Sequence, residues 1–263
     1  MTGRVDLGSH ALNCRLDGPD GADWLILSNS LGADLTMWDD QIPALGARYR
    51  VLRYDTRGHG GSDTVAGGCS FADLNRDVIG LMDHFGINRA AFMGLSMGGM
   101  TGLGLAIDHS DRVSRVVCAD ARADAPPPFR SNWDERIAKV EAGGLEAIVD
   151  ATLASWLTEN WRVANPARVA TIRRMVLAND PQGYVICCHA LKRLDYLRRL
   201  GQAGVPVLFV GGALDMGAAP EVMQAMADVT PGGVYVSIPE AAHVANINAP
   251  TAFNAAIESF LGL

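Results

Sequence analysis

The stretch AFMGLSMGGM, residues 91–100, decides how this sequence is interpreted. An apolar run typical of a buried strand stops at Ser96, and Gly94 and Gly98 stand two residues before and after it. A Gly-x-Ser-x-Gly pattern between a strand and a helix predicts a sharp turn that presents a serine nucleophile. Glycines are expected there because side chains at those positions would collide with neighbouring strands. The alternative is an ordinary glycine-rich turn with a solvated serine.

Short apolar segments and helical segments alternate on both sides of this turn. Strands are expected at residues 10–16, 24–30, 48–55, 89–95, 113–120, 205–212 and 233–240. Helices are expected at residues 70–85, 97–109, 219–229 and 250–262, the first of them opened by a capping box at Ser70 and Asp73. This alternation predicts an α/β fold in which helices cover both faces of a mostly parallel sheet.

The alternation is interrupted in the middle of the chain. Residues 125–195 show helical periodicity and no convincing strand, with Trp133, Ile137 and Val140 on one helix face. We therefore expect one α/β core, formed by residues 1–124 and 196–263, and a helical cap formed by residues 125–195.

Composition and charge exclude several classes of protein. The 263 residues are 49% hydrophobic and 19% charged, with a formal net charge of −7 and no basic stripe. This acidic balance argues against nucleic-acid binding. No apolar run approaches the length of a membrane span and no signal-peptide core opens the chain, so a soluble, cytoplasmic protein without a membrane partner is expected. The five cysteines form no CxxC pair, so no metal site is expected.

The partners that a serine nucleophile needs are present further along the chain. A serine hydroxyl needs a base, and the base needs an acid that orients it. In folds with this kind of turn, the acid and then the base follow the serine in loops after later strands. Asp215 and His243 each follow one of the last two expected strands. We predict Ser96 as nucleophile, Asp215 as acid and His243 as base, with Asp120, at the end of an earlier strand, as the alternative acid.

Such a site also needs two backbone N–H groups that stabilise a negatively charged oxygen, the oxyanion hole. One is expected from Met97, the residue after the nucleophile. The other is expected from the loop at residues 28–32, and Leu31 is the candidate there. The alternative is that this loop is only a turn.

Several segments resemble one family. SNSLGADLTMWDDQIPAL, RVLRYDTRGHGGSD, GLSMGGMTGLGLA and GALDMGAAP followed by AAHVANI are similar to bacterial 3-oxoadipate (β-ketoadipate) enol-lactonases of the α/β-hydrolase superfamily. The resemblance implies an eight-stranded α/β-hydrolase fold with a helical cap. It also implies the site roles predicted above, hydrolysis of a small lactone or ester in aromatic catabolism, and no metal or organic cofactor.

One segment departs from that family and bears on the substrate. Residues 119–126 read ADARADAP, where enol-lactonases usually have Asn-Thr-Ala-Ala-Arg-Ile-Gly. The family's substrate carries a free carboxylate, so a cation is expected near the pocket. Arg122, Arg130, Arg173 and Arg174 are the candidate anchors, and the alternative for each is a solvated surface residue. Arg122, Trp133 and Trp161 are the candidates for the pocket lining, whereas Trp156 is expected to pack the cap on the core.

Other functions remain open at this point. The same residues would serve another small-ester or lactone esterase, or a cofactor-free perhydrolase. A protein of a different class, a ligand receptor on this scaffold, would keep the triad and turn over very slowly, since fold does not determine function.

Overall fold

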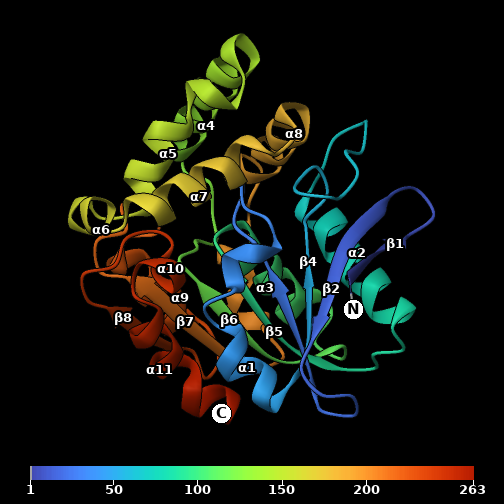
Figure 1. Cartoon of the computed structure of the whole chain (residues 1–263). Helices are drawn as coiled ribbons and strands as arrows, with labels where there is room; N and C mark the ends of the chain where they lie inside the picture. The colour runs from blue at the N-terminus through green and yellow to red at the C-terminus, as the bar shows by residue number, and fades with distance from the viewer. Residues whose placement is uncertain (1) are drawn as a thin grey trace.

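The structure is a computed structural model that describes residues 2–263 (Figure 1). Its centre is one eight-stranded sheet in the order β1-β2-β4-β3-β5-β6-β7-β8. The strands are Thr2–Asp6 (β1), Ala11–Asp17 (β2), Trp24–Ser28 (β3), Arg50–Tyr54 (β4), Ala90–Leu95 (β5), Val113–Ala119 (β6), Val207–Gly212 (β7) and Val234–Ile238 (β8). Strand β2 is antiparallel to β1 and β4, and the other neighbouring pairs are parallel. The predicted mostly parallel, eight-stranded sheet is confirmed.

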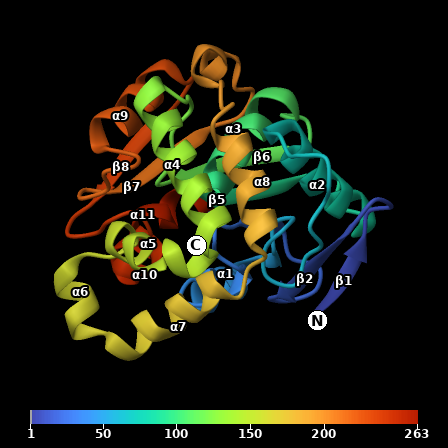
Figure 2. The same ribbon diagram turned by 90° about the horizontal axis from the view of Figure 1, so that it is seen from above.

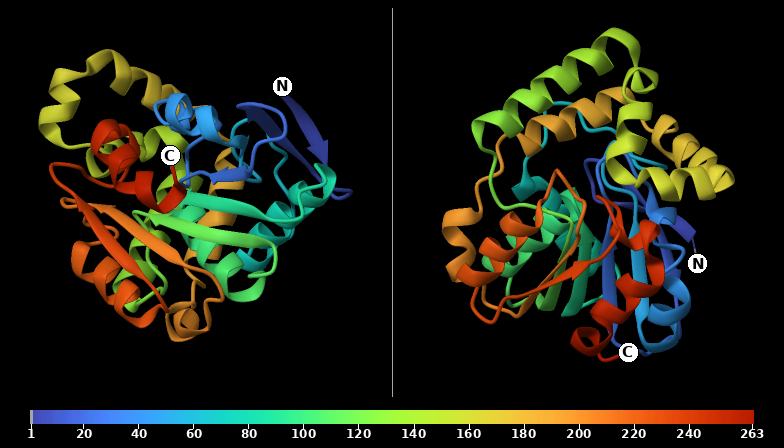
Figure 3. Two further views of the ribbon diagram at one scale, coloured as in Figure 1. Left: turned by 90° about the horizontal axis from the view of Figure 1, so that it is seen from below. Right: turned by 90° about the vertical axis from the view of Figure 1, so that its left-hand side faces the viewer.

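Helices cover both faces of this sheet, as Figure 3 shows. One core contains side chains of α2 (Phe71–His84), α3 (Met97–Asp108) and α9 (Pro220–Val229). The other contains side chains of η1 (Leu35–Trp38), α1 (Ile42–Arg48), α10 (Ala245–Asn248) and α11 (Pro250–Leu261). Successive residues of a strand point to opposite faces, so Ile26 belongs to the first core and Leu25 and Leu27 to the second.

Helix α2 illustrates how the sequence specifies these elements. The Ser70 side chain accepts from the Asp73 N–H, and the Asp73 side chain accepts from the Ser70 N–H, which completes the predicted capping box. Phe71, Leu74 and Val78 are buried in the core below, as their spacing predicts.

The predicted helical insertion lies as a layer above the sheet (Figure 1). It contains α4 (Pro127–Gly143), η2 (Leu145–Ala147), α5 (Val149–Trp156), α6 (Glu159–Ala164), α7 (Pro166–Leu177) and α8 (Pro181–Leu191). Seen from above, α4 and α8 run side by side across the top of the molecule (Figure 2). Asp124 and Asp195 form an isolated antiparallel bridge where the layer joins the core. η3 (Leu197–Gln202) then leads back to β7.

Three local features differ from the sequence prediction. Strand β1 was not expected, because TGRVD holds a single large apolar residue and lacks the alternation of a half-buried strand. Helix α1 was not expected either. The strand expected at 24–30 ends at Ser28, because the next side chain, Asn29, bonds to Tyr54 and Trp38 and turns the chain away.

Within residues 2–263, no helix is long and apolar enough to cross a membrane.

Candidate active site

The turn between β5 and α3 has the strained geometry that the Gly-x-Ser-x-Gly pattern predicts. Ser96 has φ 56° and ψ −116°, a conformation that non-glycine residues rarely adopt. A Cβ on Gly94 would lie 2.1 Å from the carbonyl of Gly98, and a Cβ on Gly98 would lie 2.2 Å from the Ser28 oxygen. Both glycines are therefore required by backbone atoms that cannot move aside.

The structure brings Ser96, His243 and Asp215 into one hydrogen-bonded chain. The Ser96 Oγ lies 2.9 Å from His243 Nε2, and His243 Nδ1 lies 2.8 Å from Asp215 Oδ2. The other Asp215 oxygen accepts from the Gly217 N–H at 2.7 Å. The carboxylate is buried, whereas Ser96 is 8% exposed and the His243 side chain 17% exposed. The imidazole is thus the most accessible of the three groups, and the carboxylate is the least accessible.

The charges of Asp215 and His243 favour proton transfer from the Ser96 hydroxyl to the imidazole. Burial acts to lower the pKa of His243, but the charge and hydrogen bond of Asp215 outweigh burial and raise that pKa above its usual value. Burial acts to raise the pKa of Asp215, but His243 and the Gly217 N–H lower it overall. An ionised acid therefore stabilises a protonated base, which is the arrangement that general-base catalysis requires.

The loop after β3 lies against this turn. The Gly98 N–H donates to the Asn29 carbonyl at 3.0 Å. The Asn29 side-chain amide donates to the Tyr54 carbonyl and accepts from Trp38 Nε1. Within the part of the chain that is described, the N–H groups of Leu31 and Met97 have no acceptor. Leu31 lines the same cavity as Ser96, and Met97 follows Ser96 in the sequence, so these two N–H groups stay the candidates for the predicted oxyanion hole.

A cavity of about 510 Å³ opens above these residues, between the sheet and the helical layer. Parallel strands end at the same edge of a sheet, so the loops after β3, β5, β6, β7 and β8 meet there. Those loops contribute Leu31, Ser96, Asp120, Asp215 and His243 to the wall. The layer contributes the roof, which includes Phe129, Trp133, Arg136, Trp156, Arg162 and Tyr184. Trp133 therefore lies where the sequence predicts it, and Trp156, buried in the second core, also faces the cavity.

Arg136 is the cation that the sequence interpretation missed. Its Nε donates to the Tyr184 hydroxyl at 2.6 Å, its Nη2 bonds to the Thr152 hydroxyl, and its guanidinium lies 5.6 Å from the Trp133 ring centre. These acceptors are neutral, and no carboxylate within residues 2–263 forms an ion pair with it. The signal was present, because Arg136 stands three residues after Trp133 on the same helix face.

Two residues that were expected in the pocket lie elsewhere. Arg122 does not line the cavity, because its guanidinium bonds to Asp124 and lies 4.7 Å from the Phe129 ring centre. Trp161 is part of a separate surface hollow and packs on the second core. None of the other candidate anchors lines the cavity: Arg130 and Arg174 are exposed, and Arg173 pairs with Asp150.

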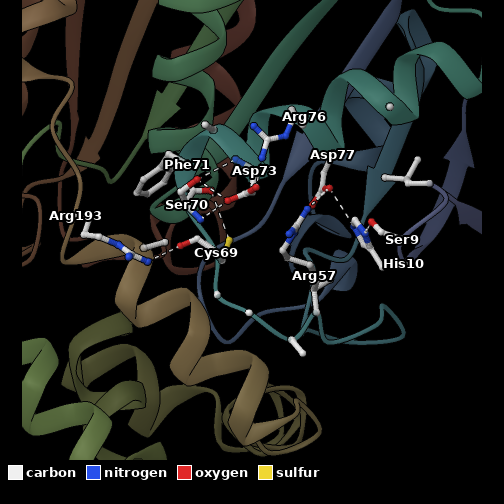
Figure 4. Close-up of a pocket in the computed structure, with 18 of the residues that line it drawn as sticks. Ser9, His10, Arg57, Cys69, Ser70, Phe71, Asp73, Arg76, Asp77 and Arg193 are labelled. Atoms are coloured by element: carbon white, nitrogen blue, oxygen red, sulfur yellow. Dashed lines mark hydrogen bonds and ion pairs between the residues drawn. The ribbon is translucent and has the colours of Figure 1, made fainter.

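A larger hollow, about 1180 Å³, lies beside α2 (Figure 4), and Ser96 is not among the residues that line it. Its central charges satisfy one another: Arg57 binds Asp77 through two nitrogens, at 2.7 and 2.5 Å, and His10 Nε2 lies 3.0 Å from the same carboxylate. Arg193 donates to the Cys69 carbonyl. Because these groups are already paired with one another, they are less available to bind a ligand than the groups of the Ser96 cavity are.

The five cysteines are free and buried, and no described residues form a cluster that could hold a metal ion.

Comparison with known proteins defines the class. The sequence profile of the alpha/beta hydrolase fold family matches residues 23–250. The chain belongs to this family, and the predicted fold class is confirmed.

Relatives narrow the comparison. The 3-oxoadipate enol-lactonase 2 of Acinetobacter baylyi is 35% identical over 251 residues, which cover 95% of this chain and 93% of the relative. The crystal structure of the enol-lactonase from Burkholderia xenovorans LB400 superposes with a TM-score of 0.96 at 38% identity, and covers 99% of this chain and 100% of that one. A thermophilic esterase from Thermogutta terrifontis, described as malate bound, has a TM-score of 0.92 at 26% identity, and the match covers 100% and 98% of the two chains. The resemblance to enol-lactonases is confirmed, and the chain is a hydrolase of the carboxylic ester class.

Proposed function

We propose that this protein is a serine hydrolase that opens a small, negatively charged lactone, with 3-oxoadipate enol-lactone as the substrate. The observation that carries the proposal is Arg136, a cation without a carboxylate partner, in the same cavity as Ser96 and His243. A guanidinium in such a place recognises a carboxylate well. The enol-lactonase relatives and the malate-bound esterase support a carboxylate-bearing ligand.

In the first half of the reaction, His243 Nε2 takes the proton of Ser96 as the serine oxygen attacks the lactone carbonyl. The negative oxygen that forms accepts from the N–H groups of Leu31 and Met97, and each such donor contributes roughly 3 to 4 kcal/mol in comparable sites. Asp215 keeps the imidazole in the tautomer that accepts the serine proton. Collapse of this intermediate breaks the ring C–O bond, and His243 returns the proton to the leaving enol oxygen.

In the second half, water attacks the acyl-serine while His243 takes its proton. Collapse then releases the new carboxylic acid and restores the Ser96 hydroxyl. The freed enol converts to a ketone, which favours the forward direction. Ser96 and His243 account for every proton transfer in this reaction, and no metal or organic cofactor is required.

We propose that residues 125–195 act as the cap over this reaction and that residues 1–124 and 196–263 form the catalytic core. The cap supplies the apolar and cationic roof, and the core supplies the reacting groups. A substrate would therefore be held by its carboxylate against α4 while its lactone carbonyl meets Ser96.

The test compares 3-oxoadipate enol-lactone with p-nitrophenyl acetate, an ester without a carboxylate. Ser96→Ala should abolish cleavage of both. Arg136→Met should raise KM for the enol-lactone by about 10- to 100-fold, the value of one charged hydrogen-bonded contact, and leave KM for p-nitrophenyl acetate within about twofold. Arg130→Met, on the exposed side of the same helix, is the matched control and should change neither.

Two results would contradict the proposal at different levels. Cleavage that survives Ser96→Ala would refute the serine mechanism. Cleavage of the simple ester alone, still dependent on Ser96, would keep the mechanism and refute the enol-lactone as substrate.

A further inference from the structure

Asp120 is a buried carboxyl group at the reaction site to which the mechanism above gives no role. It is the residue directly after β6, it is fully buried, and it lines the cavity together with Ser96 and His243. Its backbone has φ 44°, a conformation that costs free energy for any residue with a side chain. It also lies in the ADARADAP segment, where the sequence departs from that of enol-lactonases.

The two oxygens of this carboxyl group bind two different loops. Oδ1 accepts from the Gly212 N–H at 2.7 Å, and Gly212 begins the turn that leads to Asp215. Oδ2 accepts from the Ala245 N–H at 3.2 Å, two residues after His243. One side chain thus connects the loop of the acid to the loop of the base.

The backbone of the same segment is fastened to the other strands of the site. The Ser96 N–H donates to the Ala119 carbonyl at 2.8 Å, and the Asp120 N–H donates to the Val210 carbonyl at 2.8 Å. The end of β6 therefore touches all three loops that carry Ser96, Asp215 and His243. A shift here would move all three relative to one another.

The carboxyl group is also close enough to affect the charges of the site. Burial and the nearby Asp215 raise the pKa of Asp120 well above its usual value, while His243 and the two N–H donors oppose that rise. When Asp120 is ionised, its charge adds to the effect of Asp215 in raising the pKa of His243, and Arg136 acts in the opposite direction.

We propose that Asp120 is a positioning residue of this active site: its carboxyl group accepts one hydrogen bond from the Asp215 loop and one from the His243 loop, and so holds the two loops in place relative to each other. This inference rests on the proposed serine mechanism, in which His243 is the base. Asp120 itself transfers no proton and touches no substrate.

Two variants remove the carboxyl group without adding backbone strain. Asp120→Asn keeps the shape, and asparagine tolerates positive φ better than most residues, but it replaces one of the two acceptor oxygens with an amide donor. Asp120→Gly fits φ 44° and removes both acceptors. Asp55→Asn is the matched control, because Asp55 is equally buried and accepts from two backbone N–H groups, Leu35 at 2.6 Å and Gly61 at 2.9 Å, outside the cavity.

The measurements are kcat and KM, thermal unfolding, and an NMR titration of the His243 imidazole in the whole protein. Asp120→Asn should lower kcat by about 10- to 100-fold with KM within about threefold, and Asp120→Gly should lower kcat further, because small displacements of catalytic groups are costly. The titration midpoint of His243, and with it the acid limb of kcat/KM, should move to lower pH in both, because the Asp215 loop is no longer held against the His243 loop and the Asp215–His243 hydrogen bond that raises this pKa is weakened. Asp55→Asn should lower thermal stability and leave the titration unchanged.

The inference is overturned if the His243 titration in Asp120→Asn matches that of the wild type, or if Asp55→Asn moves it equally. Because the titration needs no turnover, it decides the role of Asp120 independently. Residual activity in Ser96→Ala, measured separately, decides the serine mechanism.

Discussion

Ser96 shows how backbone strain at one residue is supported by its neighbours. Its φ is 56°, and the close packing of Gly94 and Gly98 against neighbouring backbone atoms, among them the Ser28 carbonyl, holds the turn in this conformation. The strain pushes Oγ out of the buried strand and to within 2.9 Å of His243. The two glycines are therefore part of the site, although neither has a side chain that could take part in chemistry.

Gly98→Ala tests this dependence. The new Cβ would lie 2.2 Å from the Ser28 oxygen and 3.0 Å from the Asn29 oxygen, both backbone atoms, so we expect a loss of about 2 to 3 kcal/mol in the free energy of unfolding together with loss of activity. Urea unfolding and kcat/KM measure the two effects. Gly46→Ala is the control: it lies inside α1 with no neighbour nearer than 3.6 Å, and it should leave stability unchanged or raise it. Equal behaviour of the two variants would argue against the packing described here.

Asp215→Asn tests the identity of the acid. An amide in place of this carboxylate removes the charge that stabilises protonated His243 and allows the wrong imidazole tautomer, so we expect kcat to fall by about 10³- to 10⁴-fold. This loss should exceed that of Asp120→Asn under the same conditions. A larger loss in Asp120→Asn would make Asp120 the acid and Asp215 the supporting residue.

Among the elements, α8 sets the distance between the cap and the core. Gly183 in its first turn approaches Gly58 so closely that a Cβ would lie 2.4 Å from the Gly58 Cα. The next residue, Tyr184, lines the cavity and binds Arg136. The position of the proposed carboxylate anchor therefore depends on a contact between two backbones.

Gly183→Ala should push α8 outward and move Tyr184 and Arg136 with it. We expect KM for the enol-lactone to rise by about tenfold with a smaller change in kcat, and a stability loss of about 1 to 3 kcal/mol. Steady-state kinetics with both substrates separates this from a general defect, since p-nitrophenyl acetate needs no anchor. Gly201→Ala, whose nearest neighbour lies at 3.8 Å, should change neither constant. An unchanged KM in Gly183→Ala would contradict the link between α8 and the anchor.

The elements of the core could be predicted because their signals are local. The period of α2 and the Gly-x-Ser-x-Gly turn each depend on a few adjacent residues. The cavity roof depends on long-range packing, and there the prediction was partly wrong. Arg122 looked free, but the carboxylate of Asp124, two residues away, binds it, and that neighbour was visible in the sequence. The spacing of Arg136 and Trp133 on one helix face was a signal in the sequence, but the contact of Arg136 with Tyr184, 48 residues away, depends on the packing of α4 against α8.

At the scale of the whole molecule, the site lies between two units that each supply half of it. The sheet edge supplies Ser96, Asp215 and His243, and the helical layer supplies the apolar and cationic roof. Asn179 connects the units: its Nδ2 donates to the Gly32 carbonyl and its Oδ1 accepts from the Gly60 N–H. The cavity is complete only when the cap packs on the core, so conditions that weaken this interface should weaken activity.

Acid should be such a condition, because His59 is buried beneath the cap. It is 1% exposed, its ring centre lies 6.3 Å from that of Tyr184, and its Nε2 has no partner within the described chain. Burial lowers its pKa to about 4, despite opposing contributions from the Arg57 carbonyl and Asp180. Below the ordinary histidine pKa of about 6.5, the unfolded chain binds a proton that the folded chain cannot, so stability falls as pH drops from about 6.5 towards 4.

We expect the burial of neutral His59 to lower the free energy of unfolding by about 2 kcal/mol between pH 7.5 and pH 5. His59→Asn should reduce the measured pH dependence by about that amount, because asparagine can still donate to the Arg57 carbonyl but does not titrate. Urea unfolding of both proteins at the two pH values gives the difference. His84→Asn, at the exposed end of α2, is the control and should leave the wild-type pH dependence intact. If His59→Asn loses as much stability on acidification as the wild type, the acid sensitivity arises outside the buried contact between this loop and the cap.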